Sequence, residues 1–148
     1  MYEHVRTVRP DELDRLLDLY RHLNPEDPDI KGQKHIKEIW QEICADPGIF
    51  YFAIEENGLL VSSCTLTVIK NLTRGGQPYG LIENVVTHAS YRKRGYGSAI
   101  LEKALETARS SGCYKVMLMT GRKEESTLNF YEKAGLKKGL KTAFTIKF

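Results

Sequence analysis

Residues 85–98 read VVTHASYRKRGYGS and are the most informative segment of the chain. Its β-branched beginning is typical of a strand, whereas residues 96–111 place their apolar side chains at helical spacing. A basic, glycine-containing turn therefore joins a strand to a helix. Gly95 and Gly97 allow the backbone to approach a ligand closely, and the first amides of a helix lack internal acceptors. The segment is suited to phosphate binding, although the same residues are also compatible with an ordinary helix start that binds no ligand.

Two common phosphate-binding loops do not match this turn. The Walker loop requires GxxxxGK[ST], which neither Gly95 nor Gly97 completes. The dinucleotide fingerprint GxGxxG requires a third glycine, whereas Gly97 is followed by Ser98-Ala99-Ile100. Both alternatives are therefore weakened.

The turn resembles the pyrophosphate loop of the GNAT superfamily of acyl-CoA-dependent N-acetyltransferases, whose pattern is [RQ]xxGx[GA]. Residues 92–97 read RKRGYG and fit every specified position. Residues 129–136, NFYEKAGL, resemble a second family segment, N-x-x-x-Y/FYEKxGF. The two motifs occur in the family's order, and the resemblance is clearest over residues 81–136. Residues 82–86 are most similar to glucosamine-phosphate N-acetyltransferases, and many bacterial members read similarly.

The resemblance implies that acetyl-CoA is the cosubstrate and that the amides of residues 94–98 hold its pyrophosphate. A β-bulge near residues 84–86 would separate that strand from the strand at residues 114–120, and pantetheine would pair with the exposed edge. An amide of Val86 or Thr87 would then bind the thioester oxygen. The expected cofactor-binding residues are Val85, Val86, Thr87, Arg92, Lys93, Arg94, Gly95, Tyr96, Gly97, Ser98 and Asn129.

Two catalytic residues are expected, Tyr131 from the resemblance and Glu83 from its place on the strand, close to where the acceptor should lie. Tyr131 matches the family tyrosine that protonates the departing thiolate, with aromatic packing as its alternative role. Glu83 is the expected base that takes a proton from the amine, directly or through water, unless it only pairs with a neighbouring cation. His88 is the second candidate base. Ala89 stands where the family often has proline, so a looser turn is expected.

Hydrophobic spacing predicts the remaining elements. The expected strands are residues 5–8, 49–55, 59–70, 80–87, 114–120 and 142–148, and the expected helices are residues 10–23, 36–44, 96–111 and 126–133. The pair Asn57-Gly58 predicts a tight hairpin. The near-continuous apolar run at residues 114–120 is expected of a strand buried on both faces. The predicted fold class is α/β (α+β), a mixed, mostly antiparallel, twisted sheet flanked by about four helices, which resembles the GNAT fold.

Length and composition favour a single domain over residues 1–148, because 41% hydrophobic and 28% charged residues are close to globular averages. Residues 1–56 carry 7 basic and 13 acidic side chains of the 22 and 19 present, so their net charge is −6 and that of the rest is +9. The net positive charge of residues 57–148 suits a polyanionic ligand or an ordinary solvated surface.

The three cysteines and four histidines are dispersed along the chain, so their spacing indicates neither a disulfide framework nor a metal site. No apolar run is long enough to span a membrane, and a reduced cytoplasm is the expected compartment.

The combined prediction is an N-acetyltransferase that moves an acetyl group from acetyl-CoA to a primary amine by direct attack in a ternary complex. The acceptor is a small molecule or a peptide: an acidic rim at Glu26, Asp27 and Asp29 would suit a cationic amine, and Arg74 an anionic one. A homodimer is an open alternative, whereas a membrane or nucleic-acid partner is not expected. The alternative function is a non-catalytic sensor that binds CoA or a nucleotide.

Overall fold

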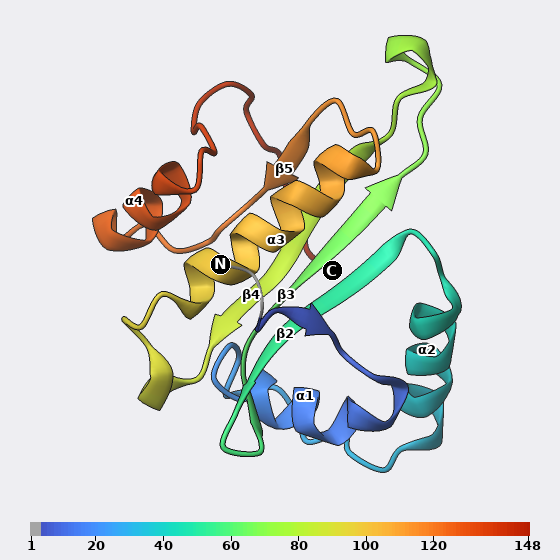
Figure 1. The fold of residues 1–148 in the computed structure, drawn as a ribbon, viewed down its shortest axis with the longest axis vertical. Helices are drawn as coiled ribbons and strands as arrows, with labels where there is room; N and C mark the ends of the chain where they lie inside the picture. Colours follow the sequence, from blue (N-terminus) through green and yellow to red (C-terminus); the bar gives the residue numbers. More distant parts are fainter. Residues whose placement is uncertain (1–3) are drawn as a thin grey trace.

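A five-stranded sheet organises residues 4–148, the part of the chain that the computed structural model describes (Figure 1). The strands lie in sequence order, and all neighbours are antiparallel except β4 and β5, which are parallel. They are β1 (Arg6–Thr7), β2 (Ile49–Glu56), β3 (Leu59–Ile69), β4 (Tyr79–Thr87) and β5 (Val116–Leu118). The helices are α1 (Leu13–Tyr20), α2 (Lys34–Ala45), α3 (Tyr96–Ser110) and α4 (Glu125–Lys133), with short 3-10 turns η1 (Pro10–Glu12), η2 (Arg74–Gly76) and η3 (Ala89–Tyr91). The predicted fold class is confirmed.

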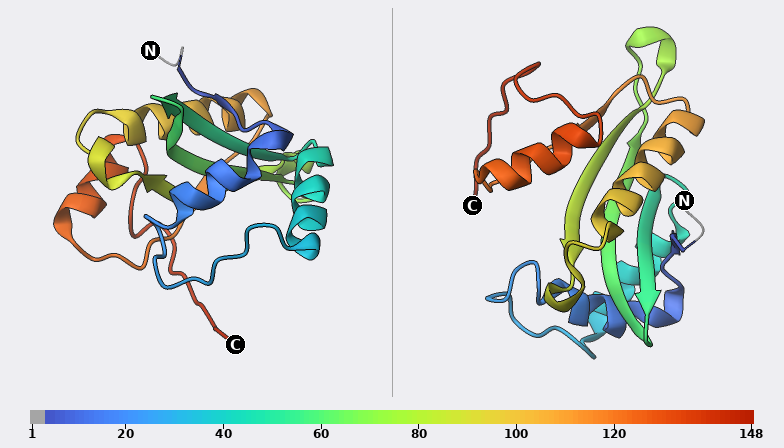
Figure 2. Two further views of the ribbon diagram at one scale, coloured as in Figure 1. Left: turned by 90° about the horizontal axis from the view of Figure 1, so that it is seen from below. Right: turned by 60° about the vertical axis from the view of Figure 1, so that its left-hand side comes forward.

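Helices cover both faces of the sheet, α3 on one face and α1 with α2 on the other (Figure 2). The alternation of side chains along β2 shows why both faces are apolar. Phe52 and Ile54 pack with Leu101 of α3, whereas Ala53, between them, packs with Leu16 of α1. Each face of the sheet therefore has its own hydrophobic core. None of the helices described in residues 4–148 is long and apolar enough to cross a membrane.

The predicted hairpin between β2 and β3 is confirmed. Asn57 and Gly58 form its turn with positive φ values of 51° and 77°, a conformation that asparagine and glycine adopt more easily than other residues. β2 pairs with residues 59–67 of β3, from Ile49↔Thr67 to Glu56↔Leu59, with a register shift between Ile54 and Glu55. This hairpin forms the middle of the sheet, and β4 pairs with its β3 side.

Two predicted strands were wrong in extent. The run at residues 114–120 forms only a three-residue β5, and its side chains are half-buried because β5 has a neighbouring strand on one side alone. The strand predicted at residues 142–148 is not formed, and this segment is exposed and without regular structure. Apolar alternation makes a segment suitable for a strand, but a strand also needs an edge with which to pair.

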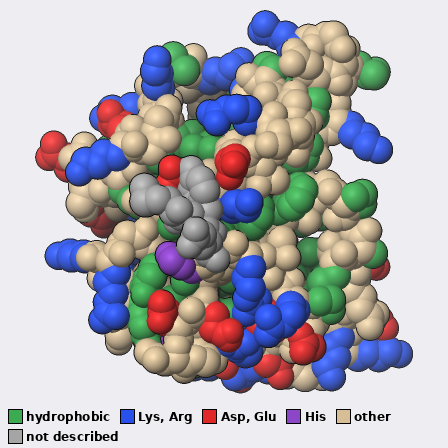
Figure 3. Space-filling model, in the orientation of Figure 1, with side chains coloured by type: hydrophobic (Ala, Val, Ile, Leu, Met, Phe, Trp, Pro, Cys, Tyr) green, Lys and Arg blue, Asp and Glu red, His purple; other side chains and the backbone are tan. Residues whose placement is uncertain are grey.

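A buried carboxylate, Glu12, joins the N-terminal elements. It is 2% exposed and accepts two hydrogen bonds from Arg6, both at 2.8 Å, one from Arg15 at 2.6 Å and one from the backbone N–H of Arg9 at 2.8 Å. Arg6 and Arg15 also reach Glu55 on β2, at 3.3 and 2.6 Å. Charged side chains of both signs gather on this part of the surface, where Figure 1 shows β1 and α1 (Figure 3). The hydrogen bonds from Arg6 outweigh burial and lower the pKa of Glu12 to about 2.

We expect Glu12→Gln to reduce the free energy of unfolding by about 3 kcal/mol at neutral pH, because it leaves the arginines without their shared charge. The folded-state pKa lies below the ordinary value of 4.5, so the stabilisation is complete above that pH and is lost as the pH falls toward about 2. Urea denaturation across this range should show a smaller loss of stability for the variant than for the wild type.

The matched control is Asp11→Asn, which removes an exposed carboxylate that lies 3.7 Å from Arg9. An exposed pair of this kind contributes little, so the control should unfold like the wild type. A Glu12→Gln protein as stable as the wild type at neutral pH would contradict the role of this carboxylate.

Candidate active site

A β-bulge interrupts β4. Ser63 and Thr65 of β3 pair with Val86 and Glu83, so one β3 residue lies opposite two β4 residues. Asn84, at the bulge, has a positive φ of 53°, which asparagine tolerates better than a branched side chain. The extra residue bends β4 and increases its twist. The bulge predicted at this point of the sequence is confirmed.

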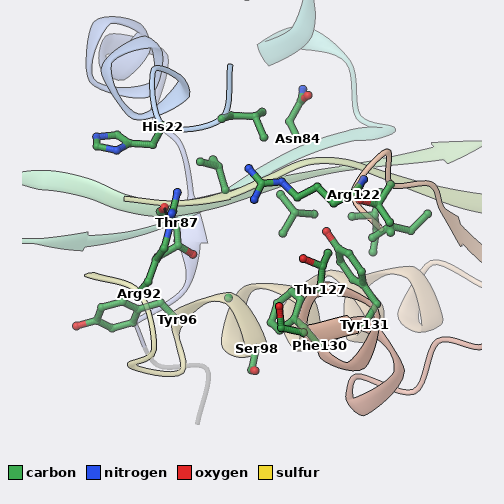
Figure 4. Close-up of a pocket in the computed structure, with 18 of the residues that line it drawn as sticks. His22, Asn84, Thr87, Arg92, Tyr96, Ser98, Arg122, Thr127, Phe130 and Tyr131 are labelled. Carbon is green, nitrogen blue, oxygen red and sulfur yellow. Dashed lines mark hydrogen bonds between the residues drawn. The ribbon is translucent and has the colours of Figure 1, made fainter. Parts of the chain in front are cut away.

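β4 and β5 separate beyond the bulge. Their pairing ends at Ile82↔Leu118, although β4 continues to Thr87. A cavity of about 740 Å³ lies at this opening, lined also by the start of α3 and by α4 (Figure 4). One edge of β4 therefore faces a cavity instead of a strand.

The backbone of Thr87 is directed toward this open side. The N–H of His88 donates to the carbonyl of Val61 on β3 at 2.8 Å. Successive N–H groups of a strand point to opposite sides, so the N–H of Thr87 points away from β3 and that of Val86 toward it. The carbonyl of Thr87 accepts a hydrogen bond from Arg92 Nε at 3.2 Å, in line with this orientation. Of the two amides considered for the thioester oxygen, the geometry favours Thr87.

The structure brings together all but two of the residues predicted for the site. The cavity is lined by Glu83, Val85, Val86, Thr87, Arg92, Lys93, Gly95, Tyr96, Gly97, Ser98 and Tyr131. Arg94 does not line it, because its guanidinium lies over the ring of Tyr91 and donates to the carbonyl of Ser90 at 3.2 Å. Asn129 is also outside the lining and is exposed on α4. Side-chain contact of these two residues with a ligand in the cavity has no support from this arrangement.

The start of α3 forms one end of the cavity. Gly95 precedes the helix with a φ of 84°, in the left-handed region that glycine adopts without strain. The first helical hydrogen bond runs from the N–H of Ala99 to the carbonyl of Gly95. The amides of residues 96–98 therefore have no acceptor within the helix, and the positive end of the helix dipole adds to their potential. An anion is the natural ligand of such an end.

Gly97 is needed for packing as well as for access by a ligand. A Cβ atom at this position would lie 2.9 Å from Cζ of Phe130 and 3.2 Å from its Cε1. The absence of a side chain thus lets α4 lie against the first turn of α3. The distance between the two helices that line the cavity depends on this contact.

Tyr131 and Arg122 lie together in the cavity. Figure 4 shows the Tyr131 hydroxyl pointing into the cavity beside the Arg122 side chain, which crosses it toward β4. Burial raises the pKa of Tyr131, and the charge of Arg122 opposes this shift. The phenol is therefore kept protonated beside a cation, an arrangement suited to donating a proton to a developing anion.

Glu83 and Arg122 are charged lining residues without a charged partner. Neither forms an ion pair within residues 4–148. Glu83 is exposed on β4 just before the bulge, and only its backbone carbonyl is fixed, by Thr65 Oγ1 at 3.1 Å. Arg122 was missed in the sequence, where a lone basic residue after a strand gives a weak signal.

His22 also lines the cavity, although the sequence did not indicate it as a site residue. It lies beside His88, the second candidate base. The rings of His22 and His88 have centroids 3.9 Å apart and are tilted by 35°. The N–H groups of Ala89 and Ser90 donate to Nδ1 of His22 and His88 at 3.3 and 3.1 Å. Burial, with the charges of His88 and Arg92, lowers the pKa of His22. His88 is outside the lining and holds the η3 turn, so Glu83 is the better-placed base.

Known acetyltransferases resemble this chain in sequence and in structure. Residues 16–136 match the Acetyltransferase (GNAT) family. The glucosamine 6-phosphate N-acetyltransferase of Trypanosoma brucei brucei is 42% identical over 86 residues, which are 58% of this chain and 56% of that protein. The chain spans about half the length of the curated relatives it matches.

Solved structures agree with this match. The structure named "Putative acetyltransferase from Agrobacterium tumefaciens str. C58" has a TM-score of 0.91 and 42% identity, covering 97% of this chain and 99% of that chain. An acetyltransferase of Trypanosoma brucei has a TM-score of 0.80 and 32% identity, covering 97% and 98%. The family match extends over both strands that form the opening and both helices that line it. The resemblance seen in two short motifs therefore covers all the elements around the cavity, and this chain belongs to the GNAT family of acetyltransferases.

Proposed function

We propose that this protein transfers an acetyl group from acetyl-CoA to a primary amine, and that residues 1–148 act as one catalytic domain. GNAT acetyltransferases use acetyl-CoA as acetyl donor, which supports the choice of cosubstrate. The observation that carries the proposal is a single cavity with two chemically different ends. The free amides at the start of α3 suit an anion, and Tyr131 on α4 offers a proton donor.

The cofactor would lie along β4. Its pyrophosphate would accept hydrogen bonds from the amides of residues 96–98, and the exposed Arg92 and Lys93 would add positive potential beside it. The pantetheine arm would then pair with the open edge of β4, where the N–H of Thr87 is directed, in the manner of an added strand. This path leads the thioester toward the bulge and Tyr131.

Direct attack is the reaction that these groups support. The amine lone pair forms a bond to the thioester carbonyl carbon, and an amide on the open edge of β4 stabilises the charge that develops on oxygen. The C–S bond then breaks, and the thiolate takes a proton from Tyr131. The proton lost by the amine passes to Glu83, directly or through water. No acyl-enzyme is required.

We further infer that the acceptor amine carries an anionic group, with a phosphorylated amino sugar as the leading candidate. Arg122 crosses the cavity beside Tyr131 and has no carboxylate partner in residues 4–148 (Figure 4). The Trypanosoma brucei brucei relative is named for glucosamine 6-phosphate. The acidic rim considered for a cationic amine gives less support, because Asp27 and Asp29 line an adjoining hollow of about 120 Å³ and not the cavity itself.

The contact between α3 and α4 gives a test of the anion-binding end. We expect Gly97→Ala to weaken CoA binding at least tenfold, because its Cβ would displace Phe130 and shift the first turn of α3. Isothermal titration calorimetry with CoA measures the effect, and circular dichroism checks the fold. Adding Phe130→Leu to Gly97→Ala should restore part of the affinity. Unchanged affinity in a folded Gly97→Ala protein would contradict this assignment.

The role of Tyr131 separates an enzyme from a sensor. Tyr131→Phe keeps the ring and removes the proton donor, so kcat should fall by about 10²-fold, at the lower end for acid catalysis because a thiol leaves readily. Steady-state kinetics over an amine panel, following free thiol, gives the measurement. The control is Tyr114→Phe, which changes a tyrosine outside the cavity lining.

Both variants should bind acetyl-CoA like the wild type. If the kcat of Tyr131→Phe lies within about threefold of the wild-type kcat, Tyr131 is a packing residue, because the loss of a catalytic acid should lower kcat far more. Binding of CoA by the wild type without turnover of any amine would favour the sensor.

Arg122 tests the acceptor class. We expect Arg122→Gln to raise KM for glucosamine 6-phosphate about tenfold, the effect of losing one charge-assisted contact, with little change in KM for acetyl-CoA. Glucosamine without phosphate should show no such difference. Lys123→Gln, the next residue along the chain and outside the cavity lining, is the control. Equal KM values for wild type and Arg122→Gln would exclude this arginine from acceptor recognition.

A further inference from the structure

Two histidines join two walls of the cavity. His22 follows α1, where its backbone N–H donates to a carbonyl of the helix at 3.0 Å, and residues 22–24 line the cavity. His88 begins the η3 turn, which leads into residues 91–93 of the lining. Figure 4 shows His22 at the end of the cavity where Arg92 also lies. Two segments that are far apart in the sequence therefore meet at this pair of rings.

Each ring accepts a backbone hydrogen bond through the same nitrogen. The N–H of Ala89 donates to Nδ1 of His22, and the N–H of Ser90 donates to Nδ1 of His88. A neutral imidazole accepts through the nitrogen that carries no proton, so in both rings the proton lies on Nε2. Protonation would place a second N–H at Nδ1, where it would face the backbone donor and break the bond. Both hydrogen bonds therefore require neutral histidines.

The groups around the pair also disfavour a positive charge on it. The ring centroids of His22 and His88 are 3.9 Å apart, so two protonated rings would repel each other. Burial, followed by the charges of His88 and Arg92, lowers the pKa of His22. Arg21 precedes His22 in the chain, and the guanidinium of Arg94 lies over the aromatic ring that packs edge-on against His88. The pair thus lies among cations.

No carboxylate compensates these cations at the pair. In the part of the chain that the structure describes, neither ring forms an ion pair. Two carboxylates on neighbouring elements have other partners: Asp18 of α1 lies 2.6 Å from Lys31, and Glu56 of β2 accepts from the Tyr96 hydroxyl at 3.1 Å. Tyr91 packs edge-on against the pair, with ring centroids 5.3 Å apart, and a tyrosine is uncharged at neutral pH. A proton taken up by the pair would therefore find no counter-charge.

We propose that His22 and His88 form a proton-controlled contact, which holds residues 22–24 against the η3 turn while both rings are neutral and releases this wall of the cavity when they are protonated. Free of the contact, a histidine takes up a proton near its ordinary value of about 6.5. The contact is therefore favoured above that pH and is lost progressively below it, because the released state binds more protons. The inference rests on the two hydrogen bonds and the closeness of the rings, and it does not depend on the proposed activity.

NMR spectroscopy of the unaltered chain tests the pair directly. At neutral pH both rings should show the nitrogen shifts of the Nε2–H tautomer, and the amides of Ala89 and Ser90 should be protected from hydrogen exchange. Their protection factors, which correct for the intrinsic effect of pH on exchange, should fall about tenfold between about pH 7.5 and about pH 5.5, as expected for the uptake of one proton. A proton on Nδ1 of either ring at neutral pH, or protection that does not change with pH, overturns the proposal.

Asparagine separates the hydrogen bond from the charge. Its side-chain oxygen can accept in place of Nδ1 but does not titrate, so His22→Asn/His88→Asn should keep both amides protected across this pH range. His22→Phe keeps a ring without an acceptor and should lower the protection of Ala89 at every pH. The control is His35→Asn, which removes an exposed histidine of α2 and should retain the pH dependence of the wild type.

Circular dichroism checks the fold of each variant. A folded His22→Asn/His88→Asn protein whose protection falls with pH like that of the wild type would show that other groups control the contact, and the proposal would be wrong. Unchanged protection of Ala89 in a folded His22→Phe protein would equally overturn it, because the ring nitrogen would then not hold the turn.

Discussion

β3 holds β4 in register on both sides of Asn84 and Val85, and the one extra residue between these two registers bends β4 away from β5. The cavity exists because of this bend. Without the extra residue, β4 and β5 could continue to pair and would close the edge to which we assign the pantetheine arm. A local irregularity of one strand thus opens a cavity at the edge of the sheet.

The two ends of the cavity are fixed relative to each other by helix packing. Phe130 lies against Gly97, and the next residue along α4 is Tyr131. The same contact therefore positions the free amides of α3 and the phenol of α4. For the proposed reaction this matters, because the pyrophosphate and the thioester are joined by the pantetheine arm of one molecule. A shift of α4 would move the proton donor away from the sulfur without changing either motif.

The ion pairs around Glu12 and the cavity lie at opposite edges of the sheet. Glu12 and its arginines join β1, η1 and α1, and through Glu55 they reach β2. The cavity lies at the other edge, where β4 and β5 separate and where none of the four charged lining residues, Glu83, Arg92, Lys93 and Arg122, forms an ion pair within residues 4–148. A paired charge at one edge stabilises the fold, whereas the unpaired charges at the other remain available to a ligand.

Features that depend on neighbouring residues could be predicted from the sequence. The strand, turn and helix of residues 85–98 and the Asn57-Gly58 hairpin follow from local backbone preferences, whereas the bulge was expected from the family resemblance. Which distant side chains meet depends on the folding of the whole chain. It brought His22 and Arg122 into the cavity and left Arg94 and Asn129 out of it. In the described conformation residues 142–148 have no strand beside them, and β5 is only half-buried. A strand forms only where another strand offers free hydrogen-bonding groups. The alternation of apolar residues along one chain does not say where such an edge lies.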